Sequence, residues 1–281
     1  MHIPNRPAES NKSTFGNVLN IAGSVNYRGA AYLSSASALR AGAGYVTLAA
    51  IPTVIDSVAT LLPDAVFLPL PQKGFTISKE ALPLIEERLS TGAVCALGCG
   101  IGSMNNAPDD VTELVESTLD LILRKQNFAV LDADGLNRLS LLKKKFQFKK
   151  RVVMTPHPKE LSRLMHADLE SILKDRIGAA CEASQKFDAI VLLKGHRTVI
   201  ADGNRYRINE TGNSALAKAG SGDCLTGVIA GFLAQKMEPF DAAVLGAKIH
   251  GLAGELASQE LSEYGVLASD LPKYIARALR K

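Results

Sequence analysis

Asp223 lies among small residues at the start of an apolar run with helical periodicity, within the segment 213–235. The start of a helix presents unpaired backbone N–H groups and the positive end of the helix dipole, so it attracts anions. Phosphoryl transfer to a hydroxyl needs such donors together with a carboxylate that orients the hydroxyl and accepts its proton. We therefore interpret Asp223 as a base and the amides of Gly220, Ser221 and Gly222 as an anion hole. An aspartate that only caps the helix is the alternative.

Three more polar clusters follow predicted strands. LDADGLN (131–137) places Asp132 and Asp134 at a strand end, where we expect one of the two carboxylates to cap the next helix. In TPHPKE (155–160), two prolines hold His157 in an extended segment, which suits either a structural histidine or a substrate contact. In LKGHRT (193–198), Lys194 leaves a buried strand and either extends to solvent or binds phosphate.

The glycine-rich segment LGCGIG (97–102) also follows a predicted strand. Its G-x-G-x-G spacing differs from the dinucleotide fingerprint G-x-G-x-x-G, and the next acids at a strand end, Asp132 and Asp134, come too late in the chain. This argues against a nicotinamide-dependent oxidoreductase. The segment by itself indicates only that another group approaches the backbone closely, because glycine leaves room for it.

Apolar strands alternate with helices along the chain, which predicts a mostly parallel sheet covered on both faces, an α/β fold. We expect one domain over residues 1–281, with a polar tail at 1–15. The expected strands are 18–24, 45–51, 66–70, 93–98, 128–134, 151–158 and 189–195. The expected helices are 29–43, 53–61, 78–89, 108–124, a short one after 134, several up to 187, and others after a hairpin at 199–212. Ligands bind at the carboxyl ends of the strands in such sheets, and every polar glycine cluster falls there.

Composition excludes several classes of protein. Aromatic residues make up 5% of the 281 residues and tryptophan is absent, which argues against base-stacking platforms for nucleic acid. A net charge of +4 suits an anionic small molecule. No apolar signal core or membrane-spanning run is present, and the four cysteines lack zinc-finger spacing, so we expect reduced thiols in a cytoplasmic protein. We interpret the basic run 143–151 as a solvated loop rather than a binding patch.

Eight segments, in order, resemble the ADP/ATP-dependent NAD(P)H-hydrate dehydratase family of the ribokinase-like superfamily. The resemblance covers almost the whole chain, from Lys12 to the C-terminal helices. The segments are FGNVLNIAGSVNYRGAA, LRAGAGYVTLA, LGCGIG, VLDADGLN, MTPHPKE, LLKGHRTVI, TGNSALAKAGSGDCLTG and HGLAGE.

This resemblance implies a three-layer α/β/α fold. It also implies a hydro-lyase that converts the S-epimer of NAD(P)H hydrate (NADHX or NADPHX) back to NAD(P)H. The reaction would consume ADP or ATP and would use Mg²⁺. It also implies a homotetramer and an epimerase on a separate chain. The positions matching hydrate-binding residues are Ala31, Gly100, His157 and Asp223. Those matching nucleotide-binding residues are Lys194, Gly195, His196, Arg197, Thr198 and Gly222. Asp132, Asn137 and Asn213 are secondary candidates for the site as a whole.

Three positions depart from the family pattern. Ala219 and Lys159 stand where the family usually has glycine, and Gly135 stands where it has alanine. None of these changes removes a polar group that the chemistry needs, although Lys159 alters the rim of the expected pocket.

Two other functions share the G-S-G-D loop. One is a small-molecule kinase of the same superfamily, acting on a thiamin-precursor alcohol. The other is a nucleotide-binding sensor without activity, which would gain nothing from a carboxylate beside phosphate. The segments around His157, Lys194 and Tyr27 favour the dehydratase.

Overall fold

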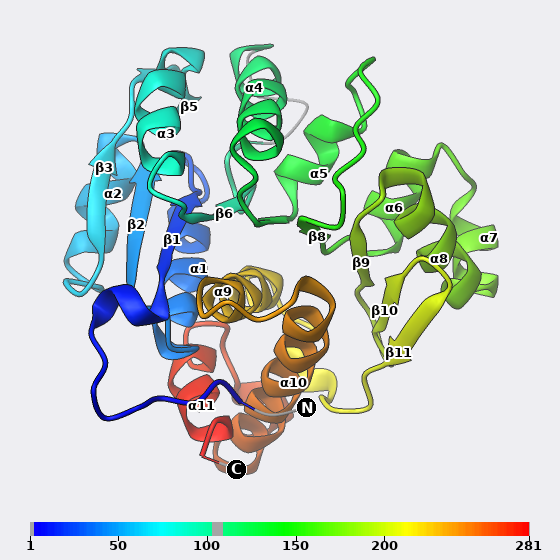
Figure 1. Cartoon of the computed structure of the whole chain (residues 1–281). Coiled ribbons are helices and arrows are strands. Elements are labelled where there is room, and N and C mark those ends of the chain that lie inside the picture. Colours follow the sequence, from blue (N-terminus) through cyan, green and yellow to red (C-terminus); the bar gives the residue numbers. More distant parts are fainter. Residues whose placement is uncertain (1–2, 103–108, 281) are drawn as a thin grey trace.

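The computed structural model describes residues 3–102 and 109–280, and its central feature is a sheet of nine strands in the order β11-β10-β9-β8-β7-β6-β1-β2-β3 (Figure 1). Seven strands, from β9 to β3 in that order, are parallel, and β10 and β11 are antiparallel. The strands are β1 (Asn17–Ile21), β2 (Tyr45–Ala50), β3 (Val66–Pro69), β6 (Val94–Leu97), β7 (Ala129–Leu131), β8 (Val152–Met154), β9 (Ile190–Leu193), β10 (Val199–Asp202) and β11 (Arg205–Ile208). Each predicted strand corresponds to one of these elements, and the predicted hairpin corresponds to β10 and β11.

Helices cover both faces of the sheet and enclose two separate hydrophobic cores, so the predicted three-layer α/β/α fold is confirmed (Figure 1). One face carries α2 (Pro52–Ala59), η2 (Lys79–Ala81), α3 (Leu82–Leu89), α4 (Asp109–Lys125), α5 (Asp134–Leu139), α6 (Pro158–Met165), α7 (Leu169–Lys174) and α8 (Arg176–Phe187). The other carries α1 (Arg28–Arg40), α9 (Ser221–Ala234), α10 (Pro239–Gly265) and α11 (Leu271–Ala278). Within the described ranges, no helix combines the length and the apolar content needed to cross a lipid bilayer.

The central strands are apolar throughout because both of their faces are covered. All four residues of β6 and all four of β9 are buried. Such continuous apolar runs are typical of parallel strands between helical layers. The alternation of these runs with helices is the pattern that made the fold predictable.

Helices α1 and α9 pack closely because their facing residues are small. A Cβ atom at Gly227 would lie 2.1 Å from the carbonyl oxygen of Ser34, and one at Gly231 would lie 2.8 Å from that of Ala38. The alanine- and serine-rich sequence of α1 supplies the other half of this contact. The close packing anchors the start of α9 at the carboxyl edge of the sheet.

A few elements differ from the sequence prediction. A small hairpin, β4 (Gln72–Lys73) and β5 (Thr76–Ile77), was not predicted because two-residue strands carry no periodicity. The predicted N-terminal tail contains a 3-10 turn, η1 (Lys12–Phe15), and another, η3 (Ser214–Leu216), precedes α9. The expected helix start at Pro108 and both ends of the predicted domain lie outside the described residues.

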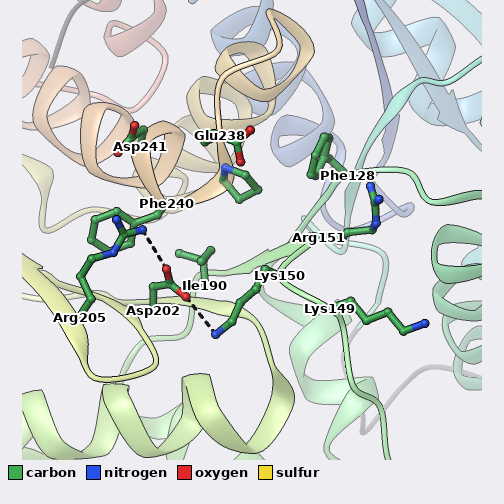
Figure 2. Close-up of a pocket in the computed structure, with 11 residues that line it drawn as sticks. Phe128, Lys149, Lys150, Arg151, Ile190, Asp202, Arg205, Glu238, Phe240 and Asp241 are labelled. Carbon is green, nitrogen blue, oxygen red and sulfur yellow. Dashed lines mark hydrogen bonds and ion pairs between the residues drawn. The ribbon is translucent and has the colours of Figure 1, made fainter.

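The basic run 143–151 lies at the amino edge of the sheet, opposite the strand ends that carry the polar clusters. Lys150 contacts Asp202 (Nζ to Oδ1, 2.9 Å), and Arg205 reaches the same carboxylate from the other side (2.8 Å; Figure 2). Arg151 donates to the carbonyl oxygen of Gln126 (2.7 Å). These pairs fasten a loop to the sheet, and the interpretation of the run as a solvated loop rather than a binding patch stays a prediction.

Candidate active site

Main-chain hydrogen bonds join the ends of neighbouring parallel strands at the carboxyl edge of the sheet. The N–H of Gly23, after β1, donates to the carbonyl oxygen of Cys99, after β6 (2.8 Å), and the N–H of Lys194, after β9, donates to that of Pro156, after β8 (2.8 Å). The strand order reverses between β1 and β6, which is where open α/β sheets form ligand sites. The polar segments therefore converge on the edge that the sequence indicated.

Asp132 and Lys194 form an ion pair in this region. Nζ of Lys194 lies 2.6 Å from Oδ1 of Asp132 and 3.7 Å from Oε2 of Glu160, and Oδ2 of Asp132 accepts a hydrogen bond from the hydroxyl of Thr226 on α9 (2.8 Å). The side chains of Lys194 and Asp132 are only 20% and 2% exposed. Burial opposes the charge on Lys194, but the two carboxylates outweigh burial and raise its pKa. Lys194 therefore points into the site as a fixed cation and does not extend to solvent.

Neither aspartate of the LDAD segment caps α5, so that expectation is wrong. The N-cap is Ala133, at φ 48°, and no side chain caps the helix. Both carboxylates face other partners: Asp132 pairs with Lys194, and Oδ2 of Asp134 accepts the N–H of Gly102 (2.9 Å). Burial raises the pKa of Asp134. A left-handed alanine is strained, and here it turns the chain so that both acids meet groups across the strand ends.

Asp223 is the third residue of α9 and does not serve as its cap. The N-cap is Gly220, and α9 has no side-chain cap. Oxygen of Asp223, oxygen of Asp132 and Sγ of Cys99 lie within 4.8 Å of one another. Burial, followed by the nearby charge of Asp132, raises the pKa of Asp223 to about 7, while a hydrogen bond from Cys99 and the charge of Lys194 oppose that rise. A carboxyl with this pKa can accept a proton near neutral pH.

The first turn of α9 presents open main-chain donors. Within residues 3–102 and 109–280, the N–H groups of Gly220, Gly222 and Asp223 have no hydrogen-bond partner, whereas that of Ser221 donates to the carbonyl oxygen of Lys218 (3.2 Å). Gly220 adopts φ 90°, which favours glycine, and a Cβ there would lie 2.5 Å from Cδ1 of Leu33. The helix start therefore offers the amides of Gly220, Gly222 and Asp223 and a positive dipole to an anion, whereas the amide of Ser221, predicted as part of the anion hole, is already bonded.

A cavity of about 780 Å³ opens beside this helix start. Its walls include every residue predicted to hold a nucleotide, namely Lys194, Gly195, His196, Arg197, Thr198 and Gly222. His157 and Asn213 also line it. The volume lies in the usual range for ligand sites, and the cavity combines cations with apolar groups such as Leu216 and Leu225.

Arg176 holds the loop that carries the predicted nucleotide residues. Its guanidinium donates to the carbonyl oxygens of Leu193 (3.1 Å), Lys194 (3.4 Å) and His196. The loop turns sharply at Gly195, where φ is 144°. Arg176 opens α8, far from this loop in sequence, and no local motif marks it, so sequence reasoning did not find it.

His157 caps α6 while lining the cavity. Its Nδ1 accepts the N–H groups of Lys159 (3.1 Å) and Glu160 (3.2 Å), and Glu160 returns a bond to the N–H of His157 (2.7 Å). Burial and then the charge of Lys194 lower the pKa of His157 to about 4. The ring is therefore neutral at pH 7, with its hydrogen on Nε2. The cap fixes the ring, and its contact with substrate stays a prediction.

Ala31 and Gly100 do not line the cavity and lie instead on the side of Cys99. Ala31 is fully buried on α1, so its side chain offers no surface to a ligand. Gly100 adopts φ 66°, and a Cβ there would lie 2.6 Å from that of Tyr27. The predicted hydrate-binding residues are thus divided: His157 lines the cavity, whereas Ala31, Gly100 and Asp223 are not among the residues that line it.

The two asparagines predicted as secondary candidates differ in position. Asn213 lines the cavity and binds Ser258 through Nδ2 (2.8 Å), while its Oδ1 caps η3. Asn137 accepts a hydrogen bond from Arg163 (2.8 Å) and is not among the residues that line the cavity. Of the two asparagines, only Asn213 lines the same cavity as the predicted nucleotide-binding residues.

The three residues that depart from the family pattern differ in their surroundings: two are exposed and one is closely packed. Ala219 and Lys159 are exposed, and the N–H of Lys159 still serves the His157 cap. At Gly135 a Cβ would lie 2.7 Å from Cδ1 of Leu131 and 2.8 Å from the carbonyl oxygen of Leu97, so glycine suits this close approach.

The site offers Mg²⁺ two carboxylates but no complete set of ligands. The group of Cys99, Asp132 and Asp223 is the one described cluster that brings three potential ligand atoms together. Mg²⁺ prefers oxygen ligands, thiols suit softer metals, and Asp132 already binds Lys194. The residues present therefore fit an ion held mainly by nucleotide phosphates and water.

Several residues of the site were not predicted. Thr226 and Glu160 secure the Asp132–Lys194 pair, and Cys99 contacts Asp223. His250 contacts Ser221 from α10. Thr226 follows Asp223 by three residues, which places it near the same face of a helix, so this spacing was a usable signal.

Comparison with known proteins shows which family the chain belongs to. The family model described as NAD(P)H-hydrate dehydratase matches residues 18–277. The chain is 38% identical over 283 residues to a bifunctional NAD(P)H-hydrate repair enzyme from Moorella thermoacetica, covering 99% of this chain and 52% of that protein. It is 33% identical to the ADP-dependent (S)-NAD(P)H-hydrate dehydratase of Bacillus subtilis, covering 99% of this chain and 94% of that one. The chain thus spans about half the length of the first of these relatives.

Solved structures also include a similar member of the NAD(P)H-hydrate dehydratase family. The ADP/ATP-dependent NAD(P)H-hydrate dehydratase from Bacillus subtilis, co-crystallized with ATP/Mg²⁺, matches with a TM-score of 0.82 at 31% identity, over 99% of this chain and 94% of that one. A hydroxyethylthiazole kinase from Pyrococcus horikoshii matches with a TM-score of 0.60 at 17% identity, over 95% of this chain and 89% of that one, which shows a shared ribokinase-like fold alone.

Proposed function

The chain belongs to the NAD(P)H-hydrate dehydratase family, and on that premise we propose that it returns the S-epimer of NADHX or NADPHX to NADH or NADPH, using ADP or ATP as phosphoryl donor. The observation that carries the proposal is the carboxyl of Asp223, with a pKa of about 7, beside open amides at the start of α9. A sensor would gain nothing from this carboxyl, because a carboxylate beside phosphate weakens anion binding.

The proposed reaction has two stages. Asp223 accepts the proton of the hydroxyl on C6 of the hydrate, and the oxygen attacks the terminal phosphorus of the nucleotide. An O–P bond forms, and the bond from phosphorus to the bridging oxygen breaks, releasing ADP from ATP or AMP from ADP. The C6–O bond then breaks with phosphate as the leaving group, driven by the ring nitrogen lone pair. Loss of the C5 proton restores the double bond, so the net outcome is that of a hydro-lyase.

The residues divide between the two ligands in this proposal. The amides of Gly220 and Gly222 stabilise charge on the migrating phosphoryl group, and Lys194 supplies a fixed positive charge near it. The loop Lys194–Thr198 and Gly222 hold the nucleotide in the cavity of about 780 Å³. Gly100 acts through its main chain beside Asp223, and His157 contacts the hydrate from the cavity rim. Ala31 is fully buried and supports this side of the site by packing.

Mg²⁺, when bound to the nucleotide phosphates, would neutralise charge that builds up during transfer. The co-crystallization of the Bacillus subtilis relative with ATP/Mg²⁺ supports this assignment. Asp132 and Asp223 are the carboxylates near enough to assist through water.

Assembly and setting complete the proposal. We propose that the whole chain works as one domain, forms a homotetramer in the cytoplasm, and receives its S-epimer from a separate epimerase. The name of the bifunctional relative from Moorella thermoacetica, of which this chain spans about half, supports a functional link to a second repair activity.

A repair assay tests the proposed function. Purified protein is given hydrated NADH with ATP, and separately with ADP, while absorbance of the reduced nicotinamide and released phosphate are followed. We expect one phosphate for each NADH formed. A stable phosphorylated product without NADH would identify a small-molecule kinase, and nucleotide binding without turnover would identify a sensor.

A further inference from the structure

His250 is a buried titratable residue that the proposed chemistry does not use. It lies on α10, is 8% exposed and lines the cavity beside Ser221. Its Nε2 is 2.9 Å from the main-chain oxygen of Ser221 and 3.1 Å from the hydroxyl oxygen of the same residue. One ring nitrogen thus contacts two oxygen atoms of the first residue of α9.

These two contacts determine where the hydrogen atoms lie. A carbonyl oxygen only accepts hydrogen bonds, so Nε2 of His250 must carry a hydrogen. With that hydrogen in place, Nε2 has no lone pair for the Ser221 hydroxyl, which therefore cannot donate to it. Burial lowers the pKa of His250 to about 4, so the ring is neutral at pH 7 and its single N–H hydrogen is the one on Nε2.

The hydroxyl hydrogen of Ser221 is left without an acceptor among residues 3–102 and 109–280. Ser221 is 5% exposed and lines the cavity. Buried donors are almost always paired in native proteins, so this one takes its acceptor from whatever fills the cavity, solvent or a bound ligand. The neighbouring N–H groups of Gly222 and Asp223 also lack partners, and together the three donors call for an anion.

We infer that the Ser221 hydroxyl donates a hydrogen bond to a phosphate oxygen of the bound nucleotide, and that His250 is a positioning residue that sets the direction of this donor. The inference rests on the proposed use of the cavity for a nucleotide. It adds a side-chain donor to the main-chain donors of α9 and gives α10 a part in nucleotide binding.

The same segment of α10 also contacts residues 211 and 212, which line the cavity as well. Oε1 of Glu255 accepts the N–H of Gly212 (2.6 Å), and a Cβ at Gly251 would lie 2.1 Å from Oγ1 of Thr211. The segment HGLAGE (250–255) therefore contacts both walls, which accounts for a sequence motif that the chemistry alone leaves without a role.

The test measures binding of ATP and of adenosine by calorimetry, with no hydrate present. Ser221→Ala should weaken ATP binding about 10- to 100-fold, the usual range for a hydrogen bond to a charged group, and should leave adenosine binding unchanged. His250→Ala should weaken ATP binding by a smaller factor, again with adenosine unchanged. His250→Gln should recover most of the loss, because an amide N–H can replace Nε2–H toward the Ser221 carbonyl. Lys248→Ala, at an exposed position of the same helix, is the control.

A double-mutant cycle separates positioning from general packing. In the His250→Ala background, Ser221→Ala should cost less than it does alone, because the donor is already misdirected. Equal losses for ATP and adenosine, unchanged ATP binding in Ser221→Ala, or no recovery with His250→Gln would overturn the inference. If His250→Ala fails to fold, the binding of ATP and of adenosine by Ser221→Ala and His250→Gln still tests the inference. Failure of the hydrate assay with the ATP-specific loss intact would reject the proposed function and leave this inference standing.

Discussion

The two edges of the central sheet carry similar ion pairs but differ in their burial. At the carboxyl edge, the Lys194–Asp132 pair has side chains that are 20% and 2% exposed. At the amino edge, Lys150 and Arg205 share Asp202, and the Lys150 and Asp202 side chains are 41% and 22% exposed. Lys194 of the first pair lines a cavity of about 780 Å³, and the second pair borders a hollow of about 390 Å³ (Figure 2).

The helices that begin at the two edges differ more than the ion pairs do. Helix α9 begins with glycines and open amides, and the one acid of its first turn, Asp223, is assigned to the reaction. Helix α10 begins with Glu238 at its N-cap, followed by Pro239, which has no N–H, and Asp241. Acids at a helix start neutralise its positive end. The Lys194–Asp132 pair adjoins a helix start with open amides, whereas the Lys150–Asp202 pair adjoins one that carries Glu238 and Asp241, so we expect an anion to bind at the carboxyl edge and not at the amino edge.

The largest effect is expected at the open helix start. Asp223→Asn removes the proposed base, so kcat should fall about 10²- to 10⁴-fold while the protein still folds. Steady-state rates with the hydrate and ATP, together with a thermal melt, measure this. If Asp223→Asn turns over at close to the wild-type rate, another group is the base and the assignment of Asp223 is wrong.

The ion pairs of the two edges should differ in their contribution to stability. Lys194→Met leaves Asp132 buried without its partner, which should lower the free energy of unfolding by about 3 kcal/mol. Lys150→Met is the matched change at the amino edge and should cost about 1 kcal/mol or less, because that pair is partly exposed. Urea unfolding of both variants measures the two losses of unfolding free energy. Equal losses would contradict the expected difference between the two ion pairs.

Asp223 should also impose a pH dependence. Its carboxylate is the active form, so kcat/KM with the hydrate should rise with pH and level off above its pKa of about 7. Cys99→Ala removes a hydrogen bond that lowers this pKa, so the rise should move to higher pH. If the pH profile of kcat/KM in Cys99→Ala matches that of the wild type, the hydrogen bond from Cys99 to Asp223 is contradicted.

The same pKa has a consequence for stability. Because it is higher in the folded than in the unfolded chain, the folded state binds the extra proton between about pH 4 and pH 7, and stability falls as pH rises through this window. Asp223→Asn should therefore be more stable than the wild type at pH 8 and no more stable at pH 4, as urea unfolding at the two pH values would show.

The smallest effect is expected at the amino edge. Lys149 lines the hollow there, and it makes no ion pair or hydrogen bond within the described part of the chain. Lys149→Gln should leave kcat and KM within about twofold of wild type, as is usual for surface changes. A larger change, tested with ATP and hydrate at two salt concentrations, would show that the basic run takes part in function.

The fold could be read from the sequence because the strands are continuous apolar runs, as in β6 and β9, separated by helical patterns. Lys194 could be singled out because it follows a strand and precedes a glycine, and the family resemblance extended the predicted nucleotide-binding residues to Thr198. The capping roles were harder to predict. His157 caps a helix and Asp132 does not, because the ion pair with Lys194 depends on which strand ends are neighbours in space. Arg176 and His250 act across long sequence separations, and no local pattern reveals such contacts.

Cys99 has a consequence for how the protein meets oxidants and alkylating reagents. Its sulfur lies beside the proposed base, yet the residue is only 1% exposed, and burial followed by the charges of Asp223 and Asp132 raises its pKa well above the ordinary value. Peroxide and electrophiles attack the thiolate, and this group stays a shielded thiol. A cysteine can therefore stand within reach of the reacting centre without making that centre a target of oxidative damage.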